Sequence, residues 1–218
     1  FMGGPSKVIV ERVQTSDDIS DALERLKNKR WYYLAVPGLG DGETDTVVEY
    51  IKEQRTQYHK TFKAVLPLAA ADNEGIINFA TDNIKIAAKT YTTAEFCCRI
   101  AGILAGLPLN RSATYYTLPE VESITESETP DDDVDNGKLI LINDGTKIKI
   151  ARGVNSLTTA TEDKGDDFKK IKIIEAVDMI RDDIRATFED EFVGKIENSY
   201  DNKIVFIAAV NKYFKDLA

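Results

Sequence analysis

The sequence predicts an α/β protein in which helices pack on a mixed β-sheet, followed by a β-hairpin and two C-terminal helices. Three observations predict this class. Up to residue 67, β-branched and aromatic runs alternate with segments of helical periodicity, which is typical of a parallel sheet covered by helices. An Asp-Gly pair then separates two apolar runs near residue 144, as in a β-hairpin. Beyond residue 168, apolar residues recur at helical spacing.

The first part of the chain supplies the sheet and its covering helices. Runs that read as strands occupy residues 7–13, 31–37, 62–67 and 75–81. Between the first two, Ser16 is the expected cap of a helix whose apolar positions are Ile19, Ala22, Leu23 and Leu26. A second helix is expected to begin at Thr44 or Thr46.

The most apolar predicted helix follows Thr92. Thr92 and Glu95 have the spacing of a capping box, and the residues after them leave little polar surface, so we expect this helix to be buried. Gly102 and Gly106 would let another backbone approach it closely. The neighbours Cys97 and Cys98 are interpreted as two buried thiols in a reducing compartment.

The second part begins with an acidic, proline-containing loop at 126–137. The predicted hairpin at 138–152 alternates Lys147 and Lys149 with isoleucines, which places both lysines on a solvated face. Helices are expected at 169–192 and 203–217. We treat residues 1–218 as one core domain, divided into an α/β part (about 7–121), an acidic loop (122–137), and the hairpin with the C-terminal helices (138–218).

Composition excludes several classes of function. The chain carries 28 basic and 37 acidic residues, a net charge of −9, so no nucleic-acid partner is expected, because phosphates require a basic face. No apolar run approaches the ~20 residues that span a bilayer, so no membrane insertion is expected.

Two loops superficially resemble ligand sites. Gly38 and Gly40 fit a dinucleotide-binding loop, but the third glycine position holds Glu43, whose charge would repel a pyrophosphate. Counting from Asp131, an EF-hand loop would need glycine at position 136 and glutamate at 142, where the chain has asparagine and isoleucine. We interpret the first as a turn and the second as no dedicated metal site.

The residues needed for a phosphate-binding loop or a histidine-based catalytic site are also missing from the sequence. Arg152-Gly153 lacks the glycine-rich turn and lysine of a P-loop, so we expect Gly153 to bend or bulge the strand and Asn155 with the threonines to make local turn hydrogen bonds. His59 is the sole histidine and reads as an exposed loop residue. The sequence therefore predicts no catalytic, cofactor or metal site, and no enzyme.

The helix predicted at 169–192 has an unusual charge order. It starts with Lys169, Lys170 and Lys172 and ends with a Glu-Asp-Glu run at 189–191, the reverse of what the helix macrodipole favours. Either an exposed helix tolerates this order, or a partner surface selected it.

Two stretches together resemble a known family. "AEFCCRIAGILAGLPLNRSATYYTLPEV" (94–121) and "LILINDGTKIKIARGVNSLTT" (139–159) are similar to contractile tail sheath proteins of myophages, PBSX-type defective prophages and R-type bacteriocins. "FKAVLP" and "AADNEGIINF" resemble the PBSX-like branch from Gram-positive bacteria. The resemblance extends from about residue 30 to the end, and its family motif includes Arg152, Gly153, Val154, Asn155, Thr158 and Thr159.

The resemblance implies a structural protein without a cofactor. Family members form stacked hexameric rings around an inner tube, and the sheath contracts when the baseplate triggers it. The implied partners are other sheath subunits, the tube protein and the baseplate, within a virion or phage-tail-like particle assembled in the bacterial cytoplasm. The resemblance also implies a tube-facing helix, for which Lys169, Lys170 and Lys172 are the candidates, and terminal arms that we expect to be missing from residues 1–218.

Two other classes of function stay open at this point. Alternating strands and helices also suit a flavodoxin-like enzyme domain that binds a nucleotide or flavin, although the fingerprint loop is incomplete. A small acidic adaptor domain would form a defined heteromer instead of tubes.

Overall fold

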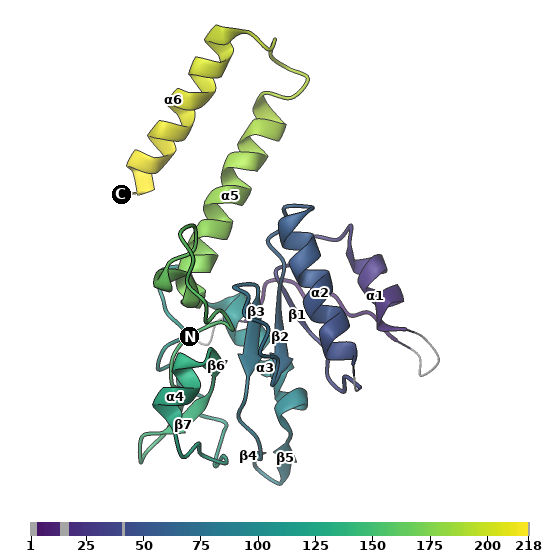
Figure 1. Cartoon of the computed structure of the whole chain (residues 1–218), viewed down its shortest axis with the longest axis vertical. Helices are drawn as coiled ribbons and strands as arrows, with labels where there is room; N and C mark the ends of the chain where they lie inside the picture. Colours follow the sequence, from purple (N-terminus) through teal and green to yellow (C-terminus); the bar gives the residue numbers. More distant parts are fainter. Residues whose placement is uncertain (1–3, 14–17, 41, 218) are drawn as a thin grey trace. The chain divides into compact units, whose positions relative to one another are not determined.

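The computed structural model describes residues 4–13, 18–40 and 42–217. The chain divides into two compact units, residues 1–174 and residues 175–218, called the N-terminal unit and the C-terminal unit below. The N-terminal unit contains every β-strand of the described chain (Figure 1). The C-terminal unit contains most of one long helix and the helix that follows it.

A four-stranded sheet forms the centre of the N-terminal unit. Its order is β1-β2-β3-β6, and all three pairings are parallel. The strands are β1 (Tyr33–Ala35), β2 (Lys63–Pro67), β3 (Ile76–Phe79) and β6 (Lys138–Leu139). Two separate two-stranded sheets are antiparallel: β4 (Ile84–Ile86) pairs with β5 (Lys89–Tyr91), and β7 (Leu141–Asn143) pairs with β8 (Ile148–Ile150). The predicted α/β class is confirmed.

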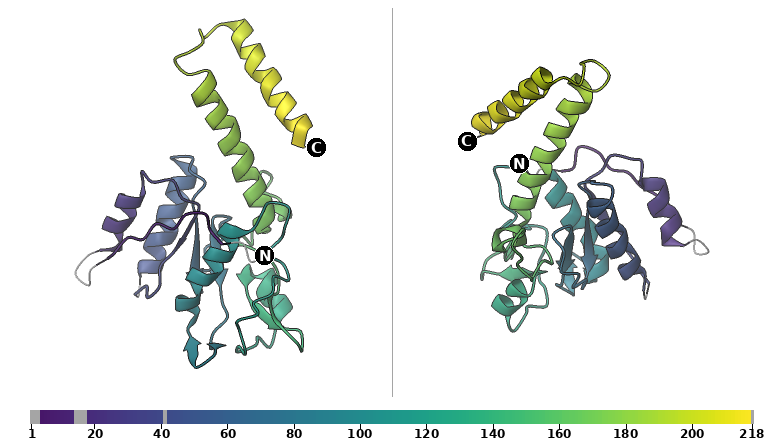
Figure 2. Two further views of the ribbon diagram at one scale, coloured as in Figure 1. Left: turned by 180° about the vertical axis from the view of Figure 1, so that it is seen from behind. Right: turned by 45° about the horizontal axis from the view of Figure 1, so that its top comes forward.

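Helices cover both faces of the central sheet (Figures 1 and 2). Successive side chains of a strand point to opposite faces, and in β2 this separates two cores. Ala64 and Leu66 pack with α1 (Ile19–Leu26) and α2 (Glu43–Thr56). Val65 packs on the other face with α3 (Thr93–Gly106). The sheet is therefore buried on both sides, which explains why β2 and β3 are almost continuously apolar.

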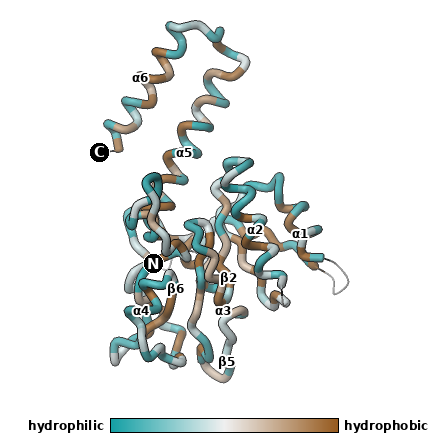
Figure 3. The backbone as a smooth tube through the Cα atoms, viewed as in Figure 1, coloured by the Kyte–Doolittle hydropathy of each residue, from teal (hydrophilic) through white to brown (hydrophobic). Residues whose placement is uncertain are grey.

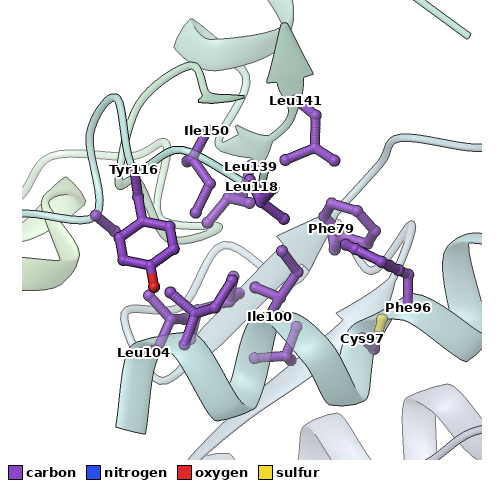
Figure 4. Close-up of a cluster of buried hydrophobic side chains, with 14 of the residues drawn as sticks. Phe79, Phe96, Cys97, Ile100, Leu104, Tyr116, Leu118, Leu139, Leu141 and Ile150 are labelled. Carbon is purple, nitrogen blue, oxygen red and sulfur yellow. The ribbon is translucent and has the colours of Figure 1, made fainter. Parts of the chain in front are cut away.

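Helix α3 is the main element of the larger core. Thr92 and Glu95 form the predicted capping box, and Ile100, which is fully buried, lies among side chains from β3, β6 and β8 (Figure 4). Two expectations for this helix are wrong. A Cβ added at Gly102 would meet no atom within 4 Å, so no backbone approaches there. Cys97 is buried as expected, but Cys98 is exposed.

Three helix boundaries differ from the sequence interpretation. Asp18 caps α1, its side chain accepting a hydrogen bond from Ser20 N, whereas the expected cap Ser16 lies outside the described residues. Gly42, in the left-handed region at φ 85°, precedes α2. The acidic loop at 126–137 contains a short helix, α4 (Pro130–Asp135), with proline at its first turn, where the missing N–H costs nothing.

Residues 7–13 are not a strand, contrary to the prediction. Val8 and Val10 are 71% and 83% exposed, while Glu11 forms ion pairs with Arg25 and Lys29. β-Branched composition favours extended backbone, but a strand also needs a neighbour with which to exchange hydrogen bonds. No described strand pairs with this segment.

The predicted hairpin at 138–152 is only partly correct. Its first residues, β6, join the central parallel sheet, and only β7 and β8 form the antiparallel pair. Of the two turn residues, Gly145 has a positive φ of 90° but Asp144 does not. The Asp144 carboxylate instead accepts hydrogen bonds from Thr146 N and Lys147 N. As predicted, Ile148 is buried and Lys147 is exposed.

The C-terminal unit is a helical hairpin. A 3-10 helix, η1 (Asp166–Lys169), precedes α5 (Ile171–Glu191), and α6 (Tyr200–Leu217) follows. Phe206 of α6 packs edge-to-face on Phe188 and Phe192. Tyr213 donates a 2.7 Å hydrogen bond to Asp183. The other apolar face of α6 is exposed at Ile204, Val205, Ile207, Phe214 and Leu217, and in Figure 3 apolar and polar residues alternate along this helix.

Candidate functional site

The residues at 153–159, the core of the sequence motif, hold three parts of the N-terminal unit together. We call the hydrogen-bonded arrangement of Asp72, Asn73 and residues 153–159 the clasp. It joins the loop before β3, the end of the β7–β8 sheet and the root of α5.

Asn155 is the centre of the clasp and is completely buried. Its backbone N–H donates to Lys169 O at 2.9 Å, and its side-chain Nδ2 donates to Phe168 O at 2.7 Å. Its Oδ1 accepts from Leu157 N at 3.0 Å. A buried amide is expensive unless paired, and here both ends of the amide are used. The residue therefore fixes the backbone that leads into α5.

Gly153 lies where the β7–β8 sheet meets residues 113–114. A Cβ added there would lie 3.1 Å from Ala113 Cβ and 3.4 Å from Thr114 N, so a side chain would require the neighbouring backbone to move. Gly153 N donates to Thr114 Oγ1, and Gly153 O accepts from Ile171 N at 2.9 Å. The expected strand bulge is wrong, because β8 already ends at Ile150. Glycine is needed here for close packing.

The second half of the clasp joins residues far apart in sequence. The Asp72 carboxylate accepts from Thr158 N at 2.7 Å and from Thr159 N at 2.9 Å. Ser156 Oγ donates to Asn73 O, and Ser156 N donates to Ile76 O. The expected local turn hydrogen bonds are therefore wrong for the threonines, whose partner Asp72 lies 86 residues before Thr158 and 87 residues before Thr159.

The charge on Asp72 is stabilised by these contacts. Hydrogen bonds from the Thr159 backbone, then from the Thr158 backbone, lower the pKa of the Asp72 carboxyl well below its usual range. Asp72 itself has a positive φ of 45°, a conformation that aspartate adopts more readily than most residues. Asp72 was not identified from the sequence, because its partners are distant along the chain. The one feature that could have drawn attention to it is its position just before an apolar strand.

A glycine outside the motif completes the clasp. Gly137 has φ 71°, and a Cβ there would lie 3.0 Å from Asn155 O and 3.0 Å from Ser156 C. Both the backbone conformation and the available space therefore require glycine.

The motif residue Arg152 points to a different role. Its side chain is exposed, and among the described residues it has no ion-pair partner. Val154, by contrast, is buried and forms a β-bridge with Lys170. The motif thus combines clasp residues, buried at 153–155 and exposed at Thr158 and Thr159, with an exposed arginine beside them.

The three candidate lysines for a tube contact lie close together but differ in environment. Lys169 pairs with Asp166 and Lys170 pairs with Asp167, each at 2.8 Å. Both precede α5, which begins at Ile171, so the predicted start of this helix was two residues early. Lys172 alone belongs to α5; it is exposed and has no ion-pair partner in the described part of the chain.

The loops that resemble ligand sites are structural. Glu43 folds back so that its carboxylate accepts from Gly40 N, which places a negative charge where a bound phosphate would lie; Asp41 is outside the described residues. In the acidic stretch, Asp133 pairs with Lys138 at 2.7 Å. Within the described ranges, no cluster of three His, Cys, Asp or Glu side chains could hold a metal ion. His59 is an exposed loop residue, as expected.

The residues of the clasp thus build a hydrogen-bonded junction between the loop before β3, the end of the β7–β8 sheet and the first turn of α5. Residues 13–156 match the phage tail sheath protein central domain, and residues 163–218 match the phage tail sheath C-terminal domain. The chain therefore belongs to the phage tail sheath family, which confirms the resemblance.

Individual relatives agree with this assignment. The chain is 40% identical over 216 residues to the tail sheath protein of Clostridium phage phiCD119, covering 98% of this chain and 60% of that protein. It is 25% identical over 181 residues to the phage-like element PBSX protein XkdK of Bacillus subtilis, covering 80% of this chain and 39% of that protein. The crystal structure of the sheath tail protein from Desulfitobacterium hafniense matches with a TM-score of 0.83 at 24% identity, covering 91% of this chain and 48% of that one. The likeness to the PBSX branch is thus confirmed, and the chain spans between 39% and 60% of the length of these relatives.

None of the described helices is both long and apolar enough to cross a membrane.

Proposed function

We propose that this chain is the core of a contractile tail sheath subunit. Such subunits polymerise helically around an inner tube in stacked hexameric rings, and contraction drives the tube through a target cell envelope. The observation that carries the proposal is the match to both the central and the C-terminal sheath domains, over residues 13–156 and 163–218. The clasp supports it, because it joins the regions matched by these two domains.

The proposed partners are further copies of the subunit, the inner tube protein and the baseplate, in a virion or phage-tail-like particle assembled in the host cytoplasm. A helical array needs a heterologous contact that repeats without closing. Contraction needs two packings of one subunit that differ in free energy. No chemical step is assigned to the protein, and no cofactor is needed.

Electron microscopy of the full-length protein tests this function. Negatively stained preparations should contain hollow tubes of regular diameter, with six-fold symmetry in end views. A protein that stays monomeric at all concentrations and salt conditions, or forms a defined complex with one soluble partner, would contradict the sheath assignment.

We extend the proposal to the surface that contacts the tube. Lys169, Lys170 and Lys172 are the candidates, and the local ion pairs of the first two partly neutralise their charge. Lys172 is therefore expected to contribute most. Lys172→Glu should lower the fraction of sheath that co-sediments with tube protein, whereas the control Lys85→Glu, at an exposed lysine of β4 that pairs with Glu122, should not. Equal co-sedimentation of both variants would exclude the proposed contact.

A further inference from the structure

Two exposed surfaces of the N-terminal unit carry opposite charges and lie on opposite faces of the central sheet. The first, the basic patch, comprises Arg111, Tyr115, Lys147, Lys149 and Arg152. The second, the acidic groove, is a hollow of about 470 Å³ between α1 and α2 that includes Leu23, Glu24, Glu49, Tyr50 and Glu53.

The basic patch is held together by backbone contacts. Tyr115 N donates a hydrogen bond to Ile150 O at 2.8 Å, and Thr117 forms an isolated β-bridge with Lys149. Gly153 N donates a hydrogen bond to Thr114 Oγ1. These contacts bring the segment after α3 beside β8. Arg111, Lys147 and Arg152 are exposed, and none forms an ion pair with another described residue. Lys149 is only partly exposed and is paired with Asp144, so the positive charge that the patch offers comes from Arg111, Lys147 and Arg152, on a chain of net charge −9.

Tyr115 gives this patch the character of a contact surface. It is 65% exposed and has a positive φ of 56°, which is unusual for a bulky residue and costs free energy. Lys149 Nζ lies 5.9 Å from its ring centroid. Exposed tyrosine is one of the residue types that contribute most to binding at protein interfaces.

The acidic groove has complementary features. Leu23 and Tyr50 form an apolar part of its lining, and Tyr50 OH donates to Leu23 O at 3.2 Å. Glu24 and Glu49 have only exposed ion pairs one helical turn away, with Lys27 and Lys52. Glu53 has none among the described residues. Burial, with Glu24 and Glu53 nearby, raises the pKa of Tyr50 to about 12, as expected in a negative potential.

The two surfaces cannot meet within one copy of the chain, because they lie on opposite sides of the central sheet. The groove lies on α1 and α2, which cover one face of the sheet. The patch lies on β8 and its neighbours, whose buried residues Ile148 and Ile150 pack with α3 on the other face. Figures 1 and 2 show α1 and α2 on the far side of the sheet from β7.

From this geometry we infer that the basic patch of one copy docks in the acidic groove of the next, with Tyr115 against Tyr50, and Lys147 and Arg152 against Glu49 and Glu53. The occupant of the groove is thus a second copy of this chain. A head-to-tail contact between different surfaces propagates as a ring or a helix, and charge complementarity sets its register. The inference rests on the proposed sheath function and names one of its subunit contacts.

Charge reversal tests the contact in the full-length protein. The patch variant Lys147→Glu/Arg152→Glu and the groove variant Glu49→Lys/Glu53→Lys should each lower the sedimentable polymer by about tenfold or more, the effect of losing one desolvated charge pair. The quadruple variant, which exchanges both charges, should regain polymer, as should an equimolar mixture of the two double variants. Lys85→Glu, at an exposed lysine of β4 outside both surfaces, is the control and should leave self-assembly unchanged.

Each outcome decides the point. Unaltered polymer in both double variants would overturn the contact, and so would a loss that the quadruple variant does not reverse, once circular dichroism shows that the variants are folded. Polymer formed by the wild-type protein tests the sheath function separately: tubes with insensitive variants would keep the proposed function and reject this contact. A wild-type protein that never self-associates would reject both.

Discussion

Helices α3 and α6 are both rich in apolar residues, yet their surroundings are opposite. In α3, seven of 14 residues are buried, and Ile100 is fully enclosed. In α6, none of the 18 residues is buried, and Ile207 is 55% exposed. The difference shows that apolar periodicity predicts which face of a helix is hydrophobic. It does not predict which other element, if any, buries that face. In the N-terminal unit the central sheet covers α3, whereas α6 packs on α5 through Phe206 and keeps most of its other apolar side chains exposed.

The largest expected effect contrasts these two helices directly. Ile100→Ala should destabilise the protein by about 3–4 kcal/mol, because it removes buried methylene groups and leaves a cavity. Ile207→Ala should change stability by less than about 0.5 kcal/mol, as is usual for exposed positions. Denaturant unfolding of both variants measures the difference. Equal losses would show that α6 is covered in solution; in assembled tubes, a larger cost for Ile207→Ala would show that assembly covers it.

The second test compares two glycines of positive φ. Gly137→Ala should cost about 2–3 kcal/mol, because it combines left-handed backbone strain with a clash against the clasp. Gly145→Ala has similar strain at φ 90° but meets no atom within 4 Å, so about 1 kcal/mol is expected. Thermal unfolding of the pair separates the two contributions. Similar losses would mean that the clasp is loose enough to absorb a methyl group.

The smallest effect concerns pH. The pKa of Asp72 is lower in the folded state than in the unfolded chain, so its contribution to stability is complete above the unfolded value of about 3.9. It is lost as the pH falls through the folded pKa. Asp72→Asn should therefore cost up to about 1 kcal/mol at pH 7 and should flatten the loss of stability below pH of about 4–5.

Unfolding midpoints of wild type and Asp72→Asn between neutral and acidic pH provide the measurement. As a control, Asp131→Asn changes an exposed carboxyl of α4 and should leave the pH profile unaltered. Parallel profiles for wild type and Asp72→Asn would contradict the role assigned to this carboxylate.

The sequence correctly predicted the elements whose signals are local. The capping box at Thr92, the alternation of β8 and the buried positions of α1 depend on near neighbours and appear in the structure. The segment 7–13 failed because strand pairing is decided by a partner, not by β-branched composition. The prediction of a single hairpin was wrong for residues 138–143, which are divided between two sheets, for the same reason.

The clasp could be predicted only as a motif and not as a geometry. Asn155, Thr158 and Thr159 were recognisable as a group, but their partners Asp72 and Phe168 lie 86 residues before Thr158 and 13 residues after Asn155. Hydrogen bonds over such separations leave no periodic trace in a single sequence. The sequence contained a partial signal for the basic patch, because Lys147, Lys149 and Arg152 stood out in an acidic chain. It contained no signal for Tyr115, whose backbone conformation is visible only in the structure.

The rooting of α5 in the clasp has a mechanical consequence. The backbone entering this helix is tied by the amide of Asn155 to Phe168 and Lys169 and by Gly153 to Ile171. The first turn of α5 is therefore expected to move together with residues 153–155 when either is displaced. Because Ser156, Thr158 and Thr159 are bonded in turn to Asp72, Asn73 and Ile76, such a movement would also shift the loop before β3.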